Sequence, residues 1–226
     1  MDAALLKQLS DARDKRIAVA VITDLASGEQ EVVARRHADE HPLAVQLDEA
    51  FRFDNSRVVS TDKGEVFIHV HNPALRLVII GAVHIAQAVV PMAKQVGYDV
   101  TVIDPRGAFA TEERFAGVTL HADWPDEVLP GLELDARTAF IALTHDPKID
   151  DPALTIALKS ECFYIGALGS RKTHAARHER LKAAGVDPTR ICGPIGLDIG
   201  ARGAPEIAIS IMAEMTRHLR LGGGIS

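Results

Sequence analysis

A glycine turn directly follows one of the most apolar segments of the chain. Residues 75–80 read Leu-Arg-Leu-Val-Ile-Ile and lead into Gly81. A glycine at the end of a strand permits a sharp turn into a helix, and the free amides at that helix start can bind a phosphate. Ala86 supplies the small residue at which such a helix packs on its strand. Val83 stands where nucleotide-binding turns carry a second glycine, so its side chain disfavours close approach of a pyrophosphate.

An acidic residue follows this turn at a spacing typical of nucleotide-binding folds. Asp104 lies 23 residues after Gly81, close to the ~20 at which a carboxylate accepts from a ribose hydroxyl. Arg106 adds a cation where a 2′-phosphate or another anion could bind. Ala82 and His84 belong to the same turn, and a neutral imidazole at a helix start can hydrogen-bond a ligand. We predict ligand contacts here; the alternative is a structural turn capped by Asp104, with His84 facing solvent.

Polar residues also follow the apolar run at residues 138–143. Thr144, His145 and Asp146 would lie at the carboxyl end of a strand, where open α/β sheets bind their ligands. We predict a hydrogen-bonded acid–base set in which Asp146 orients the imidazole. The alternative is a capping loop, because Asp is a good N-cap and proline is common at the first helical position. The pair Asp151-Pro152 has that pattern and predicts a helix start at about residue 150.

A third apolar strand ends in two glycines and a group of cations. Gly166 and Gly169 free the backbone, and Ser170 is suited to cap a helix. Arg171 then falls in the first turn of a helix that, up to residue 182, holds five Lys or Arg against one Glu. Cations at a helix N-terminus oppose the helix dipole unless an anion is bound there. We predict a small anionic ligand at this helix start; the alternative is a solvated basic helix.

A fourth loop, residues 193–200, carries three glycines around one acid. Backbone this free of side chains is suited either to close contact with a ligand or to a crossing between domains. Gly196 and Asp198 are the candidate ligand contacts, with Asp198 as the polar group. Pro205 marks the start of the last helix just beyond this loop.

The elements that must position these loops follow a regular order from residue 75 onward. Near-continuous Val, Ile and Leu runs alternate with helical segments, which indicates parallel strands covered on both faces by helices. We therefore predict an α/β fold with a doubly wound parallel sheet over residues 75–226. Residues 1–74 contain a helix, short strands and a hairpin around residues 62–64, so we predict a small N-terminal α+β segment.

The composition excludes several classes of protein. The 226 residues carry a net charge of −6, whereas nucleic-acid-binding proteins are normally basic. No apolar run approaches the ~20 residues that span a bilayer, and Met-Asp-Ala does not begin a signal peptide. Cys162 and Cys192 form no spaced cluster, and His69 and His71 share a strand face without a third metal ligand nearby. We expect a cytoplasmic protein with no metal site and no nucleic-acid or membrane partner.

Four motifs occur in an order that resembles one known family. They are Gly-Ala-Val-His-Ile-Ala (81–86), Thr-His-Asp (144–146), Ile-Gly-Ala-Leu-Gly-Ser-Arg (165–171) and Gly-Pro-Ile-Gly-Leu-Asp-Ile-Gly-Ala (193–201). Together they are similar to the XdhC/CoxI family, accessory proteins of xanthine dehydrogenase and related molybdenum hydroxylases. The resemblance covers about residues 75–220, the Rossmann-like C-terminal domain of that family, and its last motif is the most specific.

The resemblance implies a cofactor-handling role. A protein of this kind binds the molybdenum cofactor (molybdopterin), holds it for sulfuration by a cysteine-desulfurase-like partner, and delivers it to the apo-subunit of the hydroxylase. It is cytoplasmic, forms a homodimer, and is not chiefly an enzyme, so we assign no catalytic residue. The resemblance implies a site with Gly81 and His84 on one side and Asp198 on the opposite side. Residues 144–146 would lie at its base, and residues 169–171 would bind the phosphate.

Two departures from the family pattern leave other functions open. The family writes a second glycine where this chain has Val83, and its longer N-terminal domain carries a Gly-Gly-Cys segment that is not found here. The first alternative is an NAD(P)-dependent oxidoreductase that uses the same crevice, although no hydride-acceptor subsite is evident. The second is a cofactor-free interaction protein whose Rossmann-like domain mediates subunit contacts only.

Overall fold

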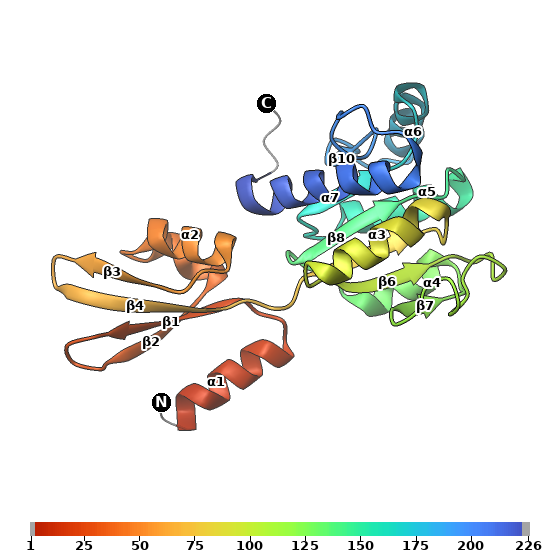
Figure 1. The fold of residues 1–226 in the computed structure, drawn as a ribbon. Coiled ribbons are helices and arrows are strands. Elements are labelled where there is room, and N and C mark those ends of the chain that lie inside the picture. The colour runs from red at the N-terminus through yellow and green to blue at the C-terminus, as the bar shows by residue number, and fades with distance from the viewer. Residues whose placement is uncertain (1–2, 223–226) are drawn as a thin grey trace. The chain divides into compact units, whose positions relative to one another are not determined.

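The computed structural model describes residues 3–222, which form two compact units (Figure 1). One unit extends to Pro73 and the other begins at Ala74. Each has its own sheet and its own buried core, and each is described separately below.

The first unit is a four-stranded antiparallel sheet with two helices. Its sheet order is β2-β1-β4-β3, and buried residues of α2 pack against β1 and β4. The predicted hairpin is confirmed, since Thr61 pairs with Gly64 across the turn. The elements are α1 (Ala3–Asp14), β1 (Val19–Asp24), β2 (Gln30–Ala34), the 3-10 helix η1 (Arg35–Glu40), α2 (Ala44–Phe53), β3 (Arg57–Thr61) and β4 (Gly64–His71).

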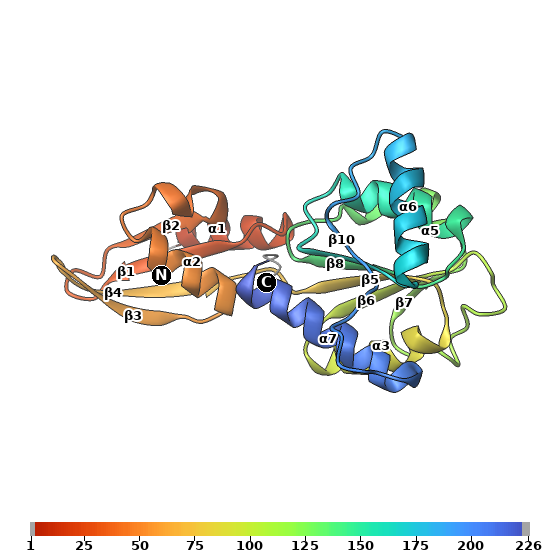
Figure 2. The same cartoon turned by 90° about the horizontal axis from the view of Figure 1, so that it is seen from above.

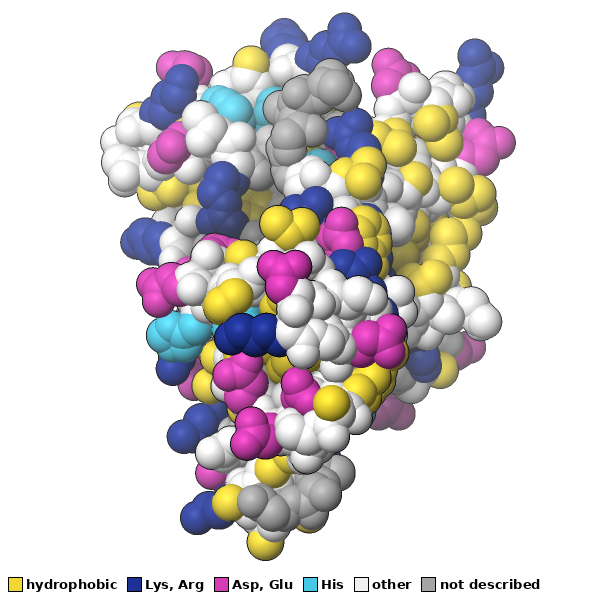
Figure 3. Space-filling view, turned by 90° about the vertical axis from the view of Figure 1, so that its left-hand side faces the viewer, with side chains coloured by type: hydrophobic (Ala, Val, Ile, Leu, Met, Phe, Trp, Pro, Cys, Tyr) yellow, Lys and Arg dark blue, Asp and Glu magenta, His cyan; other side chains and the backbone are white. Residues whose placement is uncertain are grey.

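The two histidines of β4 do lie on one face of this sheet. The ring centroids of His69 and His71 are 4.2 Å apart, as expected for residues two apart on a strand. Among the described residues, no group of three or more His, Cys, Asp or Glu side chains is arranged to hold a metal ion. On the face drawn in Figure 3, basic and acidic side chains are interspersed.

The second unit contains a six-stranded parallel sheet in the order β10-β9-β8-β5-β6-β7. The first strand, β5, lies in the middle, and the later strands are added on one side and then on the other. The predicted doubly wound parallel sheet is thus confirmed. The sequence does not predict β10, because two residues are too short for a recognisable pattern. The strands are β5 (Arg76–Ile80), β6 (Asp99–Ile103), β7 (Thr119–His121), β8 (Thr138–Ala142), β9 (Tyr164–Ala167) and β10 (Ile191–Cys192).

Helices cover both faces of this sheet (Figure 2). Residues of α3 and α7 share one buried cluster, whereas residues of α5 and α6 share another. None of the helices within residues 3–222 is both long and apolar enough to cross a membrane. The helices are α3 (His84–Gln95), α4 (Pro125–Val128), the 3-10 helix η2 (Leu129–Leu132), α5 (Pro147–Leu158), α6 (Arg171–Ala183) and α7 (Gly203–Leu221).

Alternate residues of the central strands supply the two cores. In β5, Leu77 and Ile79 face α3 and α7, while Val78 and Ile80 face α5 and α6. All four are at most 3% exposed, so both sides of the strand are dry. This explains why the strand reads as a continuous apolar run with only Arg76 at its start.

Two helix boundaries differ from simple sequence rules. We predict a helix start at about residue 150, but α5 begins at Pro147, so that prediction is wrong and Pro152 lies inside the helix. Asp146 is the N-cap and Pro147 occupies the first helical position, where a missing N–H costs nothing. Pro91 lies inside α3, and the helix continues beyond it to Gln95.

Gly81 brings the loops after β5 and β8 together. Its φ is +108°, a conformation that L side chains rarely adopt. A Cβ atom at this position would lie 2.7 Å from Cγ2 of Thr144 and 3.2 Å from its backbone nitrogen. The absence of a side chain at residue 81 therefore permits both the sharp turn and the close approach of Thr144.

We expect Gly81→Ala to lower the free energy of unfolding by about 3 kcal/mol, since backbone strain and a steric overlap act together. Urea unfolding followed by circular dichroism measures the change. Gly97→Ala is the matched control: Gly97 also has a positive φ, +88°, but nothing lies within 4 Å of its missing Cβ. The control should cost only about 1 kcal/mol. Equal costs for the two variants would show that the contact with Thr144 is unimportant.

Candidate functional site

Three of the predicted loops meet at one edge of the parallel sheet. Strands β5, β8 and β9 are neighbours, and α3, α5 and α6 begin directly after them. Because the strands are parallel, all three helix N-termini lie at the same carboxyl edge. The order of strands reverses between β5 and β8, and this is where open α/β sheets bind ligands.

Asp104 organises the first of these loops. It is fully buried, and its Oδ2 accepts a hydrogen bond from the backbone N–H of Ala82 at 2.8 Å. Arg106 donates from Nη2 to the same oxygen at 2.7 Å, and from Nε to Oδ1 at 2.9 Å. The backbone N–H of Arg106 adds a fourth bond at 3.0 Å. The acid therefore joins the glycine turn to the end of β6.

This network disfavours the predicted ribose contact. Burial alone would raise the pKa of Asp104, but the hydrogen bonds from Arg106 and Ala82 outweigh it and lower the pKa. The carboxylate is thus ionised and already accepts four hydrogen bonds. A ribose hydroxyl could reach it only if Arg106 moved away. His84, at the start of α3, is exposed to solvent.

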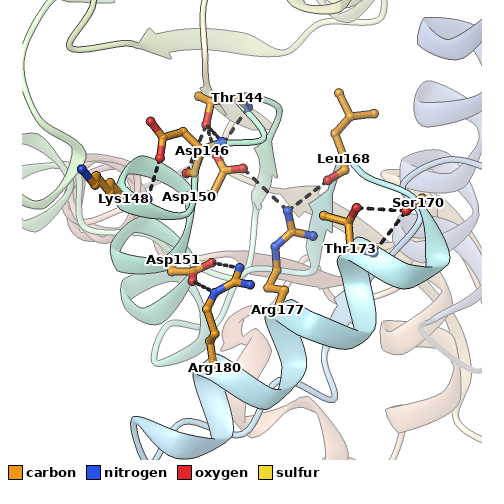
Figure 4. Close-up of polar contacts among 10 residues, drawn as sticks. All are labelled: Thr144, Asp146, Lys148, Asp150, Asp151, Leu168, Ser170, Thr173, Arg177 and Arg180. Carbon is orange, nitrogen blue, oxygen red and sulfur yellow. Dashed lines mark hydrogen bonds and ion pairs between the residues drawn. The ribbon is translucent and has the colours of Figure 1, made fainter.

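The second loop does not form the predicted acid–base set. The side chain of Asp146 accepts a hydrogen bond from the backbone N–H of Lys148 at 2.9 Å and so caps α5 instead of orienting His145 (Figure 4). The hydroxyl of Thr144 donates to Asp150 at 2.7 Å and accepts from the N–H of Asp146 at 3.0 Å. The prediction is wrong because Pro147 starts the helix and leaves Asp146 at the capping position.

His145 is left at the exposed tip of this loop. Its φ is +64°, in the left-handed region that only a few per cent of non-glycine residues occupy. Its neighbours Thr144 and Asp146 form hydrogen bonds that cap α5, whereas the imidazole is exposed to solvent. Strain of this kind is more common at ligand-binding positions than elsewhere, so His145 is the side chain of this loop best placed to meet a ligand.

A buried ion pair connects the second loop to the third. Oδ2 of Asp150 lies 3.7 Å from Nη2 of Arg177, and the two side chains are 1% and 2% exposed. Arg177 also donates from Nη2 to the carbonyl oxygen of Leu168 at 3.0 Å. Within the described residues, Oδ2 of Asp150 and both Nε and Nη1 of Arg177 lack a hydrogen-bond partner. Figure 4 shows the chain of contacts from Thr144 to Leu168.

Desolvation dominates the electrostatics of this pair. Burial raises the pKa of Asp150 despite the hydrogen bonds from Thr144 and the charge of Arg177. Burial likewise lowers the pKa of Arg177, although Asp150 opposes the shift. The attraction across 3.7 Å therefore does not fully offset the loss of water from both groups.

The third loop leads into α6 with unpaired cations at its start. Ser170 caps the helix as predicted, accepting from the N–H of Thr173 at 3.1 Å. Gly169 lies beside the same residue, its missing Cβ 3.0 Å from Cγ2 of Thr173. Arg171 and Lys172 are exposed, and no acid lies in the first turn. Among the described residues these two cations form no ion pair.

The five cations of α6 are therefore not one cluster. Arg177 is buried against Asp150, and Arg180 binds Asp151 through two hydrogen bonds of 2.6 and 3.1 Å. The helix pattern alone does not show which cations point toward α5. Within the described part of the chain, Arg171, Lys172 and Lys182 are the only cations of α6 that remain exposed without an acidic side chain as partner.

Two of the predicted glycine contacts face the protein core instead. A Cβ at Gly166 would lie 2.6 Å from Cδ1 of Ile195. One at Gly196 would lie 2.3 Å from Oγ of Ser210, and the N–H of Gly196 donates to Glu214 at 2.8 Å. Both glycines let the loop after β10 pack against β9 and α7. Asp198, in that loop, is exposed.

Asp150 and Arg177 form a buried pair beneath the candidate site, and sequence reasoning missed both. Asp150 lies in the first turn of α5, where an acid is usually solvated. The available signal was weak: Arg177 and Leu181 are four residues apart in a helix with almost no apolar face. A cation on the one apolar stripe of such a helix indicates a buried partner.

We expect Arg177→Met to destabilise the fold by about 3 kcal/mol at pH 8, because it leaves the Asp150 carboxylate buried without a cation. The cost should be smaller at pH 5. The folded-state pKa of Asp150 is raised, so the stability linked to its proton is present at low pH and is lost as pH rises through that pKa. Urea unfolding at the two pH values measures both costs.

Arg180→Met, three residues along the same helix, is the control. Its partner Asp151 is partly exposed, so the cost should be under about 1 kcal/mol and similar at both pH values. A cost for Arg177→Met that does not change with pH would contradict the assignment.

Comparison with known proteins places these features in a family. Residues 77–215 match the family model described as the XdhC Rossmann domain. A crystal structure described as a xanthine dehydrogenase from Bacillus halodurans has a TM-score of 0.68 with 25% identity. That match covers 96% of this chain and 64% of the other.

Two curated relatives match over about two thirds of the chain. The molybdenum cofactor insertion chaperone PaoD of Escherichia coli (strain K12) is 33% identical over 146 residues, 63% of this chain and 40% of PaoD. A probable xanthine dehydrogenase subunit of Bacillus subtilis (strain 168) is 31% identical over 151 residues, 66% of this chain and 44% of that protein. The matched part is thus less than half of either relative. The resemblance inferred from the four motifs is confirmed. Because the family model matches more than half of the residues of this chain, the chain belongs to the XdhC family.

Proposed function

We propose that this chain is a cytoplasmic accessory protein that binds the molybdenum cofactor and delivers it to a xanthine dehydrogenase-type hydroxylase. Family membership supports the proposal, as does the 33% identity to a protein named a molybdenum cofactor insertion chaperone. The observation that carries it is the start of α6, where Arg171 and Lys172 are exposed and unpaired beside the capping Ser170.

The chemistry of this helix start suits an anionic cofactor. Molybdopterin carries a phosphate, and free N–H groups at a helix N-terminus bind phosphate. Two cations there oppose the helix dipole when the site is empty, and an anion would remove that penalty. Arg171 can hold two phosphate oxygens at once, whereas Lys172 adds a point charge.

The neighbouring loops would hold the rest of the ligand. His145 is exposed at the tip of the loop after β8, and His84 is exposed at the start of α3. Either imidazole can hydrogen-bond the pterin ring. Thr144 acts indirectly, because its hydroxyl is already bound to Asp150. Gly81 and Asp198 remain candidate contacts.

When bound, the cofactor would supply the redox chemistry of the hydroxylase that receives it, and this chain would only hold and transfer it. We therefore assign no catalytic residue. We further propose that the chain forms a homodimer and that a cysteine-desulfurase-like partner sulfurates the cofactor while it is bound. Each of these partners follows from the family resemblance and can be tested by co-purification.

Titration of the purified chain with molybdenum cofactor, NAD(H) and NADP(H) tests the proposal. We expect the pterin to bind at micromolar or better affinity and the nicotinamide nucleotides not to bind. The side chain of Val83 disfavours a dinucleotide, and so does the carboxylate of Asp104, because it already accepts hydrogen bonds from Ala82 and Arg106. Binding of a nicotinamide nucleotide without pterin binding would support an oxidoreductase instead, and no binding at all would support a cofactor-free interaction protein.

We expect Arg171→Ala to weaken cofactor retention by about tenfold or more, since it removes a charge-assisted contact to the phosphate. Retention is measured as the pterin that remains with the protein after gel filtration. Stability should be nearly unchanged, because the side chain is exposed. Lys182→Ala, in the last turn of the same helix, is the control and should retain the cofactor normally. Unchanged retention in Arg171→Ala would show that the phosphate binds elsewhere.

We expect His145→Gly to separate stability from binding. Glycine adopts a φ of +64° without strain, so the free energy of unfolding should stay the same or rise by up to about 1 kcal/mol. Retention should weaken by about fivefold, since one hydrogen bond to the ligand is lost. His145→Asn, which tolerates this backbone conformation and keeps a donor, should lie between wild type and His145→Gly. Wild-type retention in His145→Gly would remove this residue from the site.

A further inference from the structure

A second candidate site lies beside β10, the outer strand of the parallel sheet. A cavity of about 590 Å³ opens there between α6 and α7, which cover opposite faces of the sheet (Figure 2). This volume is within the range of small-molecule sites. The side chains with titratable or charged groups that line it are Cys162 and Tyr164 at the start of β9, His174 and His178 from α6, Arg190 and Cys192 from the segment around β10, and Glu214, Arg217 and His218 from α7.

The two histidines of α6 line this cavity, and each has one buried nitrogen without a partner. Nδ1 of His174 and Nε2 of His178 are buried, and neither has a hydrogen-bond partner among the described atoms. The first packs against Gly193, where a Cβ would lie only 2.2 Å from it. Burial lowers the pKa of His174 to about 4 and lowers that of His178 as well, so both rings are neutral at pH 7. Both side chains line the cavity, and a neutral ring avoids an unpaired buried N–H by carrying its proton on the other nitrogen.

The pair formed by Cys192 and His218 needs no ligand. Nδ1 of His218 lies 3.0 Å from the carbonyl oxygen of Glu214, so this nitrogen carries the proton and donates. Nε2 is then the acceptor for the thiol of Cys192, 3.3 Å away. Burial raises the pKa of Cys192 to about 12, which keeps the thiol protonated. This cysteine is therefore a hydrogen-bond donor to histidine rather than a nucleophile.

The remaining charges favour an anion. Arg217 is half-buried and forms no hydrogen bond or ion pair within residues 3–222, whereas Arg190 binds the carbonyl oxygens of Leu158, Ser160 and Cys162. Oε2 of Glu214 already accepts from the hydroxyl of Tyr164 and the N–H of Gly196. Two guanidinium groups thus face one carboxylate in a chain whose net charge is −6.

We propose that this cavity binds a small oxyanion, such as phosphate or the phosphate group of a small metabolite. The N–H groups of His174 and His178 and the guanidinium of Arg217 would donate to its oxygens. An oxyanion offers acceptors to all three donors at once and also balances the charge of Arg217 through a charge-assisted contact. This inference is independent of the function proposed above and concerns a different set of residues.

Calorimetric titration of the full chain with inorganic phosphate tests the inference. We expect the NMR signals of the His174 and His178 rings to shift as phosphate binds beside β10, whereas a phosphate at the start of α6 would not shift both rings. Arg217→Gln and His178→Ala should each weaken the affinity by about tenfold, because each removes a donor to a charged group. Urea unfolding of each variant confirms that the fold is intact.

Two control variants decide where the ion binds. Lys182→Ala removes an exposed cation of α6 that does not line the cavity and should leave the affinity unchanged. Arg171→Ala, which removes the phosphate contact proposed at the start of α6, should leave the phosphate-dependent shifts of the His174 and His178 rings in place; their loss in this variant alone would place the ion at the start of α6 and overturn the inference. Equal weakening in Lys182→Ala, or no binding up to about 10 mM phosphate, would overturn it too.

Discussion

The carboxyl edge of the parallel sheet depends on the contact between β5 and β8. These strands are adjacent, but the helices that follow them cover opposite faces of the sheet. The two connections therefore diverge, and polar residues collect where they part. At Gly81 the loops after β5 and β8 lie in close contact, because only a residue without a side chain leaves room for Thr144. Every candidate contact in the three loops is placed relative to this point.

Buried polar groups then connect the loops to one another. Asp104 joins the glycine turn to β6, and the pair of Asp150 and Arg177 joins the loop after β8 to the carbonyl oxygen of Leu168. This arrangement separates the cations of α6 by role. Arg177 is buried and connects Asp150 to the carbonyl oxygen of Leu168, whereas Arg171 stays exposed at the helix start. The acidic net charge of the chain thus coexists with the two local positions where we propose that an anion binds.

Much of the fold follows from local patterns, because parallel strands buried on both faces are continuous apolar runs. The glycine turn and the Ser170 cap can also be predicted from the sequence, since each depends on one residue type at one position. Three features are not. Asp146 could orient His145 or cap α5, and the start of the helix at Pro147 decides between them. Which cations of α6 point inward depends on where α5 packs. The cavity beside β10 joins residues that are far apart in sequence, so no spacing reveals it.

Delivery of molybdenum cofactor to a hydroxylase can be measured directly. The decisive quantity is the rate at which a purified apo-hydroxylase of the xanthine dehydrogenase type gains activity when the cofactor is supplied either bound to this chain or free at the same concentration. We predict faster and more complete activation with the bound cofactor. Equal rates, or inhibition because the chain retains the cofactor, would contradict a role in delivery.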